Sequence, residues 1–283
     1  MGKIAPPTVS VVIPVLNGAR WLACQLEALS RDDAQPFETV IADNGSTDDT
    51  VAIARSFDRK MPLRVIDASE RPGQSFARNL GARAASGDLL LFLDNDDEIG
   101  PGYVAAMVSA LSGAEFVAAR IDDHKLNDGW CRKARTVPLI HELRRSPRPW
   151  APGGALGVRR TTFERLGGFA EDLVCGEDVE FCWRARKNDV VLTFVDDAIL
   201  HYRYRTTLRG LARQGNAYGF ADVVVDARCG TDQFTTSWSI IRSCAGPIRL
   251  LVMGPTKGNR ARGLFLLGRR VGRLRALRQL APS

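Results

Sequence analysis

Three groups of acidic residues stand where a predicted strand ends or a predicted helix begins. Asp43 follows a β-branched apolar segment, Asp94-Asn95-Asp96-Asp97 follows a wholly apolar one, and Glu177-Asp178 precedes a helical pattern. A single Asp at a strand end is usually a turn or N-cap residue. Three carboxylates within four residues repel each other unless a cation or basic groups compensate, and a hard divalent ion prefers such oxygens together with phosphate oxygens. The second group therefore predicts a divalent-cation site.

The elements that must position these residues alternate between strand and helix. Apolar and β-branched runs predict strands over 9–15, 37–42, 63–66 and 89–93, and apolar residues at helical spacing predict helices over 19–29, 75–85 and 102–111. Ser46 and Asp49 are spaced as the capping box of a further helix. Such alternation is typical of an α/β fold with a mostly parallel sheet covered by helices. Its ligands bind beyond the carboxyl ends of the strands.

The pattern weakens between about 120 and 150, where several prolines indicate a long connection. Periodicity returns over 153–158 and in a predicted helix over 161–166. A further helix is predicted over 178–186, and extended segments over 190–195 and 198–202.

Four blocks in this order resemble one known family. They read VSVVIPVLNGARWL, DNGSTDDT, RPGQSFARNLGARAASGDLLLFLDNDDEI and GGFAEDLVCGEDVEFCWRARKNDVVLTFVDDAILHYRYR, and they span about residues 8–205. Together they are similar to the family 2, GT-A type, inverting glycosyltransferases. The resemblance implies a GT-A-like (Rossmann-like) α/β/α sandwich.

The resemblance assigns a nucleotide site to the first half of the chain. Pro14 and Asn17 match the wall that lines the nucleotide, and Asp43 matches the acid that accepts a hydrogen bond from the pyrimidine ring. Uracil and thymine both present a ring N–H, so a carboxylate suits that contact. Arg78 matches an Arg that faces the nucleotide, although on a helix it could equally be a solvated charge.

The resemblance also assigns a metal site. Asp94-Asn95-Asp96 matches the Asp-x-Asp motif, in which Asp94 and Asn95 are expected to contact the nucleotide and Asp94 and Asp96 to hold Mg²⁺ or Mn²⁺. His201 matches a His that many relatives carry near the metal, with a packing role as the alternative. A divalent ion would stabilise the charge that grows on the departing nucleoside diphosphate.

An inverting transfer also needs a base for the acceptor hydroxyl, and one carboxylate suffices. Asp178 in Gly-Glu-Asp matches the family's base, with Glu177 as a neighbour that orients or pairs. The alternative is that Asp178 only caps the helix that follows. The segment 152–155, Pro-Gly-Gly-Ala, resembles the stretch that approaches the donor sugar and the acceptor, or it is a plain tight turn.

The composition is that of a globular protein. The chain has 283 residues, of which 45% are hydrophobic and 25% charged, so most of it is not disordered. No apolar run reaches the roughly 18 residues of a membrane span, and the start lacks the features of a signal peptide. The six cysteines form no C-x-x-C pair, which predicts reduced thiols and a cytoplasmic protein.

The basic residues are concentrated at the C-terminal end. No acidic residue follows Asp232, whereas the segment 233–283 carries ten Lys and Arg residues. The formal net charge is +7, and taking away those ten cations leaves −3 for residues 1–232. Apolar residues at helical spacing within 262–280 predict a basic amphipathic helix that lies on an anionic membrane surface, at the inner face of the cytoplasmic membrane. The alternative is a helix packed on the protein itself.

These patterns predict a catalytic domain over 1–220 and a basic helical extension over 221–283. The predicted reaction moves a sugar from a UDP- or dTDP-sugar to a hydroxyl of a saccharide or lipid-linked acceptor, with inversion, in glycan, polysaccharide or glycolipid synthesis. A sugar-phosphate nucleotidyltransferase is an alternative, but the segment after the first strand is poor in the Gly and basic residues that it would need. A nucleic-acid-binding protein is disfavoured because the basic tail has few aromatic residues for base stacking. A glycosyltransferase fold without activity is disfavoured because the acidic residues are all present.

Overall fold

A computed structural model describes residues 7–135, 146, 148–230 and 237–280, with the side chains of 237 and 238 left out. The chain forms two compact units. The first contains Met1–Asp122, Leu139–Asp172 and Glu177–Tyr202, and the second contains Asp123–Pro138, Leu173–Gly176 and Arg203–Ser283. The predicted boundary between residues 220 and 221 falls inside helix α9 (Leu208–Cys229).

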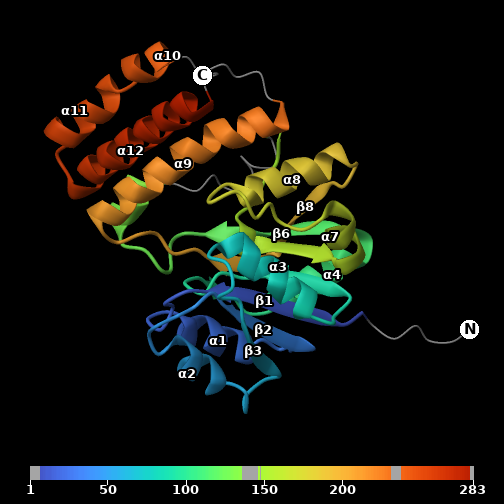
Figure 1. Ribbon diagram of the computed structural model, residues 1–283. Helices are drawn as coiled ribbons and strands as arrows, with labels where there is room; N and C mark the ends of the chain where they lie inside the picture. Colours follow the sequence, from blue (N-terminus) through green and yellow to red (C-terminus); the bar gives the residue numbers. More distant parts are fainter. Residues whose placement is uncertain (1–6, 136–145, 147, 231–236, 281–283) are drawn as a thin grey trace, which may run out of the picture. The chain divides into compact units, whose positions relative to one another are not determined.

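The first unit is built on an eight-stranded sheet of order β3-β2-β1-β4-β7-β6-β8-β5 (Figure 1). Pairing is parallel for β1 with β2 and β4, for β2 with β3 and for β6 with β8, and antiparallel elsewhere. The strands are β1 (Val9–Val15), β2 (Glu38–Asp43), β3 (Leu63–Asp67), β4 (Leu89–Phe92), β5 (Glu98–Ile99), β6 (Phe116–Asp122), β7 (Leu156–Arg159) and β8 (Leu192–His201). The mostly parallel α/β sheet confirms the predicted fold class.

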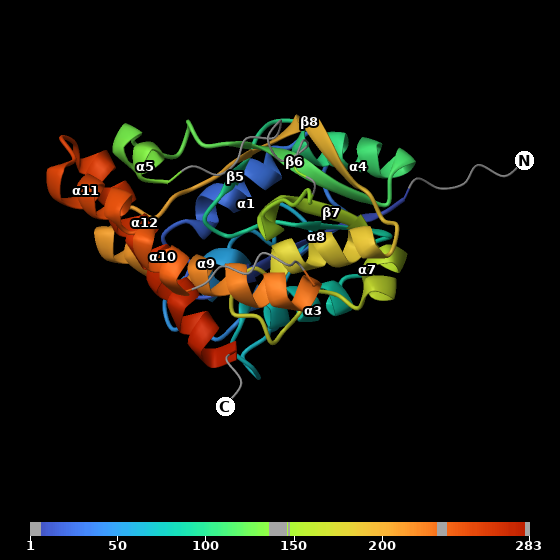
Figure 2. The same ribbon diagram turned by 90° about the horizontal axis from the view of Figure 1, so that it is seen from above.

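Helices cover both faces of this sheet (Figure 2). They are α1 (Leu22–Ser30), α2 (Thr50–Arg55), α3 (Gln74–Ala84), α4 (Tyr103–Gly113), α7 (Arg160–Leu166) and α8 (Glu177–Lys187). Successive strand residues point to opposite faces. On one face Phe92 and Phe116 pack with phenylalanines of α7 and α8. On the other, Gly157 leaves room for Leu91, Val117 and Met107 of α4. Both faces are buried, which explains the continuous apolar runs of the central strands.

The predicted capping box is wrong, and the predicted connection after residue 120 contains further elements. Helix α2 begins at Thr50 after Asp49, whose side chain makes no capping hydrogen bond, so Ser46 and Asp49 form no capping box. The Ser46 hydroxyl instead accepts a hydrogen bond from the backbone N–H of Asn17. The supposed long connection after residue 120 contains the end of β6 and then α5 (Gly129–Ala134). The six cysteines form no disulfide.

The second unit is helical and includes the basic tail. Besides α5 and α9 it contains α10 (Ser237–Arg242), α11 (Ala245–Met253) and α12 (Lys257–Leu280). Helices α9 and α12 cross so closely that a Cβ at Gly219 or Gly272 would lie within about 2 Å of the other backbone. Arg269 and Arg273 of α12 both bind the carboxylate of Asp222 on α9. No helix in the described part of the chain is long and apolar enough to span a membrane.

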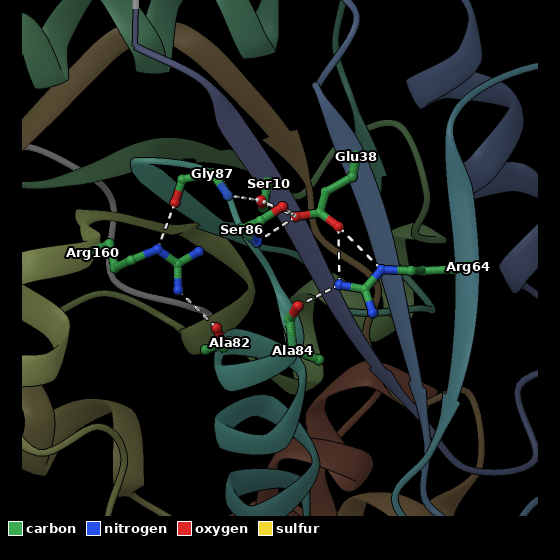
Figure 3. A network of polar contacts seen from close by, with 8 residues as sticks. All are labelled: Ser10, Glu38, Arg64, Ala82, Ala84, Ser86, Gly87 and Arg160. Atoms are coloured by element: carbon green, nitrogen blue, oxygen red, sulfur yellow. Dashed lines mark hydrogen bonds and ion pairs between the residues drawn. The ribbon is translucent and has the colours of Figure 1, made fainter.

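A polar network fastens the amino-terminal edge of the first unit's sheet (Figure 3). Glu38 at the start of β2 accepts hydrogen bonds from the hydroxyls of Ser10 and Ser86 at 2.8 and 2.7 Å and from Arg64 at 3.0 and 3.1 Å. Burial raises the pKa of Glu38, but these donors outweigh it and hold the pKa at about 2, below the usual 4.5. The carboxylate therefore ties the loop between α3 and β4 to the first two strands.

Replacing this carboxylate should destabilise the fold in a pH-dependent way. Glu38→Gln is expected to lower the free energy of unfolding at pH 7 by about 2 kcal/mol, because it removes charge-assisted hydrogen bonds. A lowered pKa stabilises the folded state above the unfolded-state value, and this contribution is lost as the pH falls through the folded-state value. The difference between the two proteins should thus shrink between pH 4.5 and about 2. Urea unfolding across this range measures it, with the exposed Glu70→Gln as control; a pH-independent difference would contradict the assignment.

Candidate active site

The predicted site residues of the first half meet at the carboxyl edge of β2, β1 and β4. The register aligns Val15 with Asp43, and Val12 with Phe92 two residues before Asp94. These strands run parallel, so the segments after them leave the sheet at the same edge. Asn17, Asp43 and Asp94 therefore come from adjacent strand ends, as the sequence predicts.

The turns after β1 and β2 are joined by hydrogen bonds. Asn17 adopts a left-handed conformation with φ of 51°, which Asn tolerates better than most residues. Its side-chain oxygen accepts a hydrogen bond from the Thr47 amide at 2.8 Å. The Asp43 carboxylate accepts one from the Ser46 amide at 3.2 Å. These hydrogen bonds join the two turns into one polar surface. Pro14 is buried within β1, three residues before Asn17.

The loop after β4, residues 93–97, is supported by a side chain of α1. Gln25 is fully buried, and its side chain accepts a hydrogen bond from the Ile99 amide at 3.0 Å and donates one to the Asp94 carbonyl at 3.4 Å. Asn95 packs against Gly18, where a Cβ would lie 2.4 Å from the Asn95 amide nitrogen. This support fixes the backbone on both sides of Asp96.

A buried ion-pair cluster lies next to that loop. Arg78 of α3 is only 1% exposed, and its two terminal nitrogens donate to Asp94 at 2.6 Å and to Glu177 at 2.7 Å. Burial alone would lower the pKa of Arg78, but the two carboxylates raise it above its usual range. Arg78 is therefore no solvated charge. It joins the loop after β4 to the start of α8.

Asp178 lies beside this cluster. One of its oxygens accepts a hydrogen bond from the Gly153 amide at 3.2 Å, and the other accepts one from the Val179 amide at 2.8 Å. Burial, and then the negative charge of Glu177, raise the pKa of Asp178 to about 7 against the opposing effect of Arg78. Helix α8 begins at Glu177, so Asp178 lies inside its first turn and is not its N-cap.

The segment Gly153–Ala155 is a short 3-10 turn that packs on the same cluster. A Cβ at Gly153 would lie 2.5 Å from an Arg78 nitrogen, and one at Gly154 would lie 2.7 Å from the Asp94 carboxyl carbon. Only glycine lets the backbone approach these charged groups so closely. This turn therefore packs directly against Arg78 and Asp94 and is not a plain connecting turn.

His201 ends β8 and pairs in register with Glu98 of β5, two residues after Asp96. Its Nδ1 lies 2.6 Å from an Asp122 carboxylate oxygen. A carboxylate on one ring nitrogen is the usual support for a His that binds a metal through the other. In the part of the chain that the structure describes, no three His, Cys, Asp or Glu side chains gather as a complete metal site. His201 thus lies on the strand beside the one that follows Asp96, and either side chain could give a ligand to a divalent ion.

Sequence reasoning missed three supporting residues. Gln25 interrupts an apolar helical stripe, which is the signal that could have marked it. Gln74 donates a hydrogen bond to Asp94 at 2.9 Å, and nothing in its sequence context marks it. Asp122 ends strand β6, and its sequence context indicates only a connection from about residue 120.

The profile of glycosyl transferase family 2 matches residues 10–185. The chain belongs to this family, which is the class that the four sequence blocks predict.

Curated relatives support the family. The chain is 32% identical over 200 residues to "Glycosyltransferase AglE" of Haloferax volcanii, covering 68% of this chain and 66% of that protein. It is 30% identical over 226 residues to "Validoxylamine A glucosyltransferase" of Streptomyces hygroscopicus subsp. jinggangensis, covering 66% and 53%. The similarity thus spans about half to two thirds of the length of these relatives.

Solved structures support the fold. The mannosyltransferase PcManGT from Pyrobaculum calidifontis, in complex with GDP-Man and Mn²⁺, has a TM-score of 0.71 at 19% identity, covering 96% of this chain and 90% of that chain. Glucosyl-3-phosphoglycerate synthase from Mycobacterium tuberculosis, in complex with Mn²⁺, UDP and glucosyl-3-phosphoglycerate, has a TM-score of 0.58 at 25% identity, covering 81% and 82%. Both structures have a GT-A type fold that matches most of this chain.

Removing the buried cation should destabilise the fold strongly. Arg78→Met leaves Asp94 and Glu177 without their shared partner, which is expected to cost about 3–5 kcal/mol of unfolding free energy. Arg83→Met on the same helix is the matched control, because its side chain is 57% exposed and its ion pair is long at 3.8 Å. That variant should lose less than about 1 kcal/mol. Equal losses in the two variants, measured by urea unfolding, would contradict the assigned role of Arg78.

Proposed function

We propose that the first unit transfers a sugar from a nucleoside diphosphate donor to an acceptor hydroxyl with inversion of the anomeric carbon. The observation that carries the proposal is the Asp178 carboxylate, held by the Gly153 amide beside the Arg78–Asp94 pair. A carboxylate whose pKa is raised to about 7 is well matched to accept a proton near neutral pH.

The donor is proposed to be a UDP- or dTDP-sugar. Asp43 is the reader of the pyrimidine ring N–H, and Pro14, Asn17 and Asn95 line the nucleotide beside it. The hydrogen bonds of Asn17 with Ser46 and Thr47 support this role, because they fix the turns that would line the nucleotide before the donor binds. With two of its nitrogens on carboxylates, Arg78 would act on the nucleotide through Asp94.

Mg²⁺ or Mn²⁺ is the proposed cofactor, with Asp96 and His201 as its protein ligands. When bound, the ion supplies charge stabilisation to the departing diphosphate. One oxygen of Asp94 already accepts hydrogen bonds from Arg78 and Gln74, which favours a contact to the ribose or to the ion through its second oxygen. Because the protein offers few ligands, the ion should bind well only together with the nucleotide.

Asp178 is the proposed catalytic base. Its carboxylate would take the proton of the acceptor hydroxyl as the hydroxyl oxygen attacks the anomeric carbon from the face opposite the leaving diphosphate. Arg78 keeps Glu177 and Asp94 compensated, so that their charges do not prevent the ionisation of Asp178 at neutral pH. The acceptor is proposed to be a saccharide or lipid-linked hydroxyl in glycan, polysaccharide or glycolipid synthesis, and not a nucleic acid.

Two substitutions should separate donor binding from chemistry. Asp96→Ala is expected to remove most of the Mn²⁺-dependent affinity for a UDP-sugar, because it deletes a metal ligand. Asp178→Asn should leave that affinity nearly unchanged and lower turnover by about 10²–10⁴, the usual contribution of a general base. Calorimetry with UDP-, dTDP- and GDP-sugars, with and without Mn²⁺, measures the first, and transfer or donor hydrolysis measures the second.

The exposed Asp189→Asn is the matched control, since Asp189 has a φ of 59° that Asn also tolerates. Near-normal turnover in Asp178→Asn would assign the base elsewhere. Unchanged Mn²⁺-dependent affinity in Asp96→Ala would remove it from the metal site.

A further inference from the structure

Helix α12, which the sequence suggests as the membrane-binding element, is largely engaged inside the second unit. Phe265 is buried and packs edge-on against Tyr218 of α9. Arg269 and Arg273 bind Asp222, and Arg275 donates a hydrogen bond to Asn216. Helix α12 therefore contributes much of its apolar and basic surface to the packing of its own unit.

Helices α10 and α11 lie along the side of α12 that faces away from α9 (Figure 1). Helix α11 packs through the backbone of Pro247 and Leu251, which leaves no room for a Cβ at Gly263 of α12. Its other side carries Ile248, Val252 and Met253, and the last two are 69% and 73% exposed. Ile248 and Val252 are four residues apart, so they share one helical face.

Exposed arginines stand beside these apolar residues. Arg249 follows Ile248 on α11, and Arg242 follows the exposed Ile241 on α10. No acidic residue occurs anywhere from 233 to 283, so nothing in this stretch of sequence offsets the positive charge. Apolar side chains flanked by basic ones on a short helix are typical of helices that lie in a membrane interface without crossing it.

We propose that the exposed face of α10 and α11, made by Ile241, Arg242, Ile248, Arg249, Val252 and Met253, binds the surface of a membrane rich in anionic lipid. The cytoplasmic leaflet has such a negative surface potential. The apolar side chains enter the headgroup region, and the two arginines contact lipid phosphates. This interaction is independent of the proposed transfer reaction.

The composition of the face argues against other occupants. Single-stranded nucleic acid needs aromatic side chains for base stacking, and the one aromatic residue between 239 and 280, Phe265, is buried. A two-fold dimer through this face would bring arginine against arginine, and like charges oppose such contact. An anionic membrane surface offers negative charge to the arginines and an apolar region to the exposed apolar side chains.

The test is binding of the full chain to vesicles of phosphatidylcholine with and without 30% phosphatidylglycerol, by co-sedimentation. Arg242→Gln with Arg249→Gln should weaken binding to the anionic vesicles about 30-fold, since each basic residue contributes about 1 kcal/mol and 1.4 kcal/mol is tenfold. Ile248→Gln with Val252→Gln should weaken it about tenfold or more. All four positions are exposed, so the fold should persist, as thermal unfolding checks.

Matched controls come from α12. Arg262→Gln with Arg278→Gln, and Val271→Gln with Leu280→Gln, change equally exposed residues outside the proposed face and should alter binding less than about threefold, because screening limits distant charges. Equal losses from both helices, or no preference for anionic vesicles, would overturn the proposal. Two other results would also overturn it. One is a dimer, seen in sedimentation velocity, that the α10–α11 substitutions abolish while vesicle binding persists. The other is binding of a single-stranded oligonucleotide that the same substitutions abolish while vesicle binding persists.

Discussion

The buried guanidinium of Arg78 is the interaction on which the candidate site depends. A cation with 1% exposure is stable only if carboxylates compensate it, and those carboxylates in turn lose most of their hydration. Arg78 meets this requirement with Asp94 from the loop after β4 and Glu177 from the start of α8. Segments almost one hundred residues apart in sequence are thereby held at one point, with Asp178 immediately beside it.

The rest of the site is arranged around this constraint. The glycines at 153 and 154 let a turn close over Arg78 and Asp94, and the same turn donates a backbone hydrogen bond to Asp178. Gln25 supports the acidic loop from α1. Because the backbone fixes these groups before any ligand arrives, a transfer reaction would need little reorganisation of the protein. The network around Glu38 lies at the amino end of β2, whereas Asp43 of the candidate site lies at its carboxyl end. It is therefore expected to contribute stability without contacting the site.

The sequence was sufficient to predict the strands and the acids at their ends, because a buried parallel strand requires a continuous apolar run and the residue after it must leave the sheet. It could not predict β6, where Arg120 interrupts the run and the pairing partners, β7 and β8, lie far along the chain. The carboxylate that supports His201 was missed for this reason. Arg78 could not be distinguished from a surface charge, since helical spacing does not reveal which face meets buried acids. Helix α9 was missed because its glycines lower helix propensity, although they are what allows its close crossing with α12.

Burial and the neighbouring charges of Glu177 and Arg78 together set the ionisation of Asp178. Carbon-13 NMR of labelled aspartate carboxyls, with the signal assigned through Asp178→Asn, measures that ionisation directly in the wild-type protein and in Glu177→Gln. Asp178 is expected to titrate at about 7 in the wild type and at clearly lower pH in Glu177→Gln, because the neighbouring negative charge is gone and Arg78 remains. Titration of Asp178 near its ordinary value of 3.8 in both proteins would show that neither burial nor Glu177 shifts its pKa.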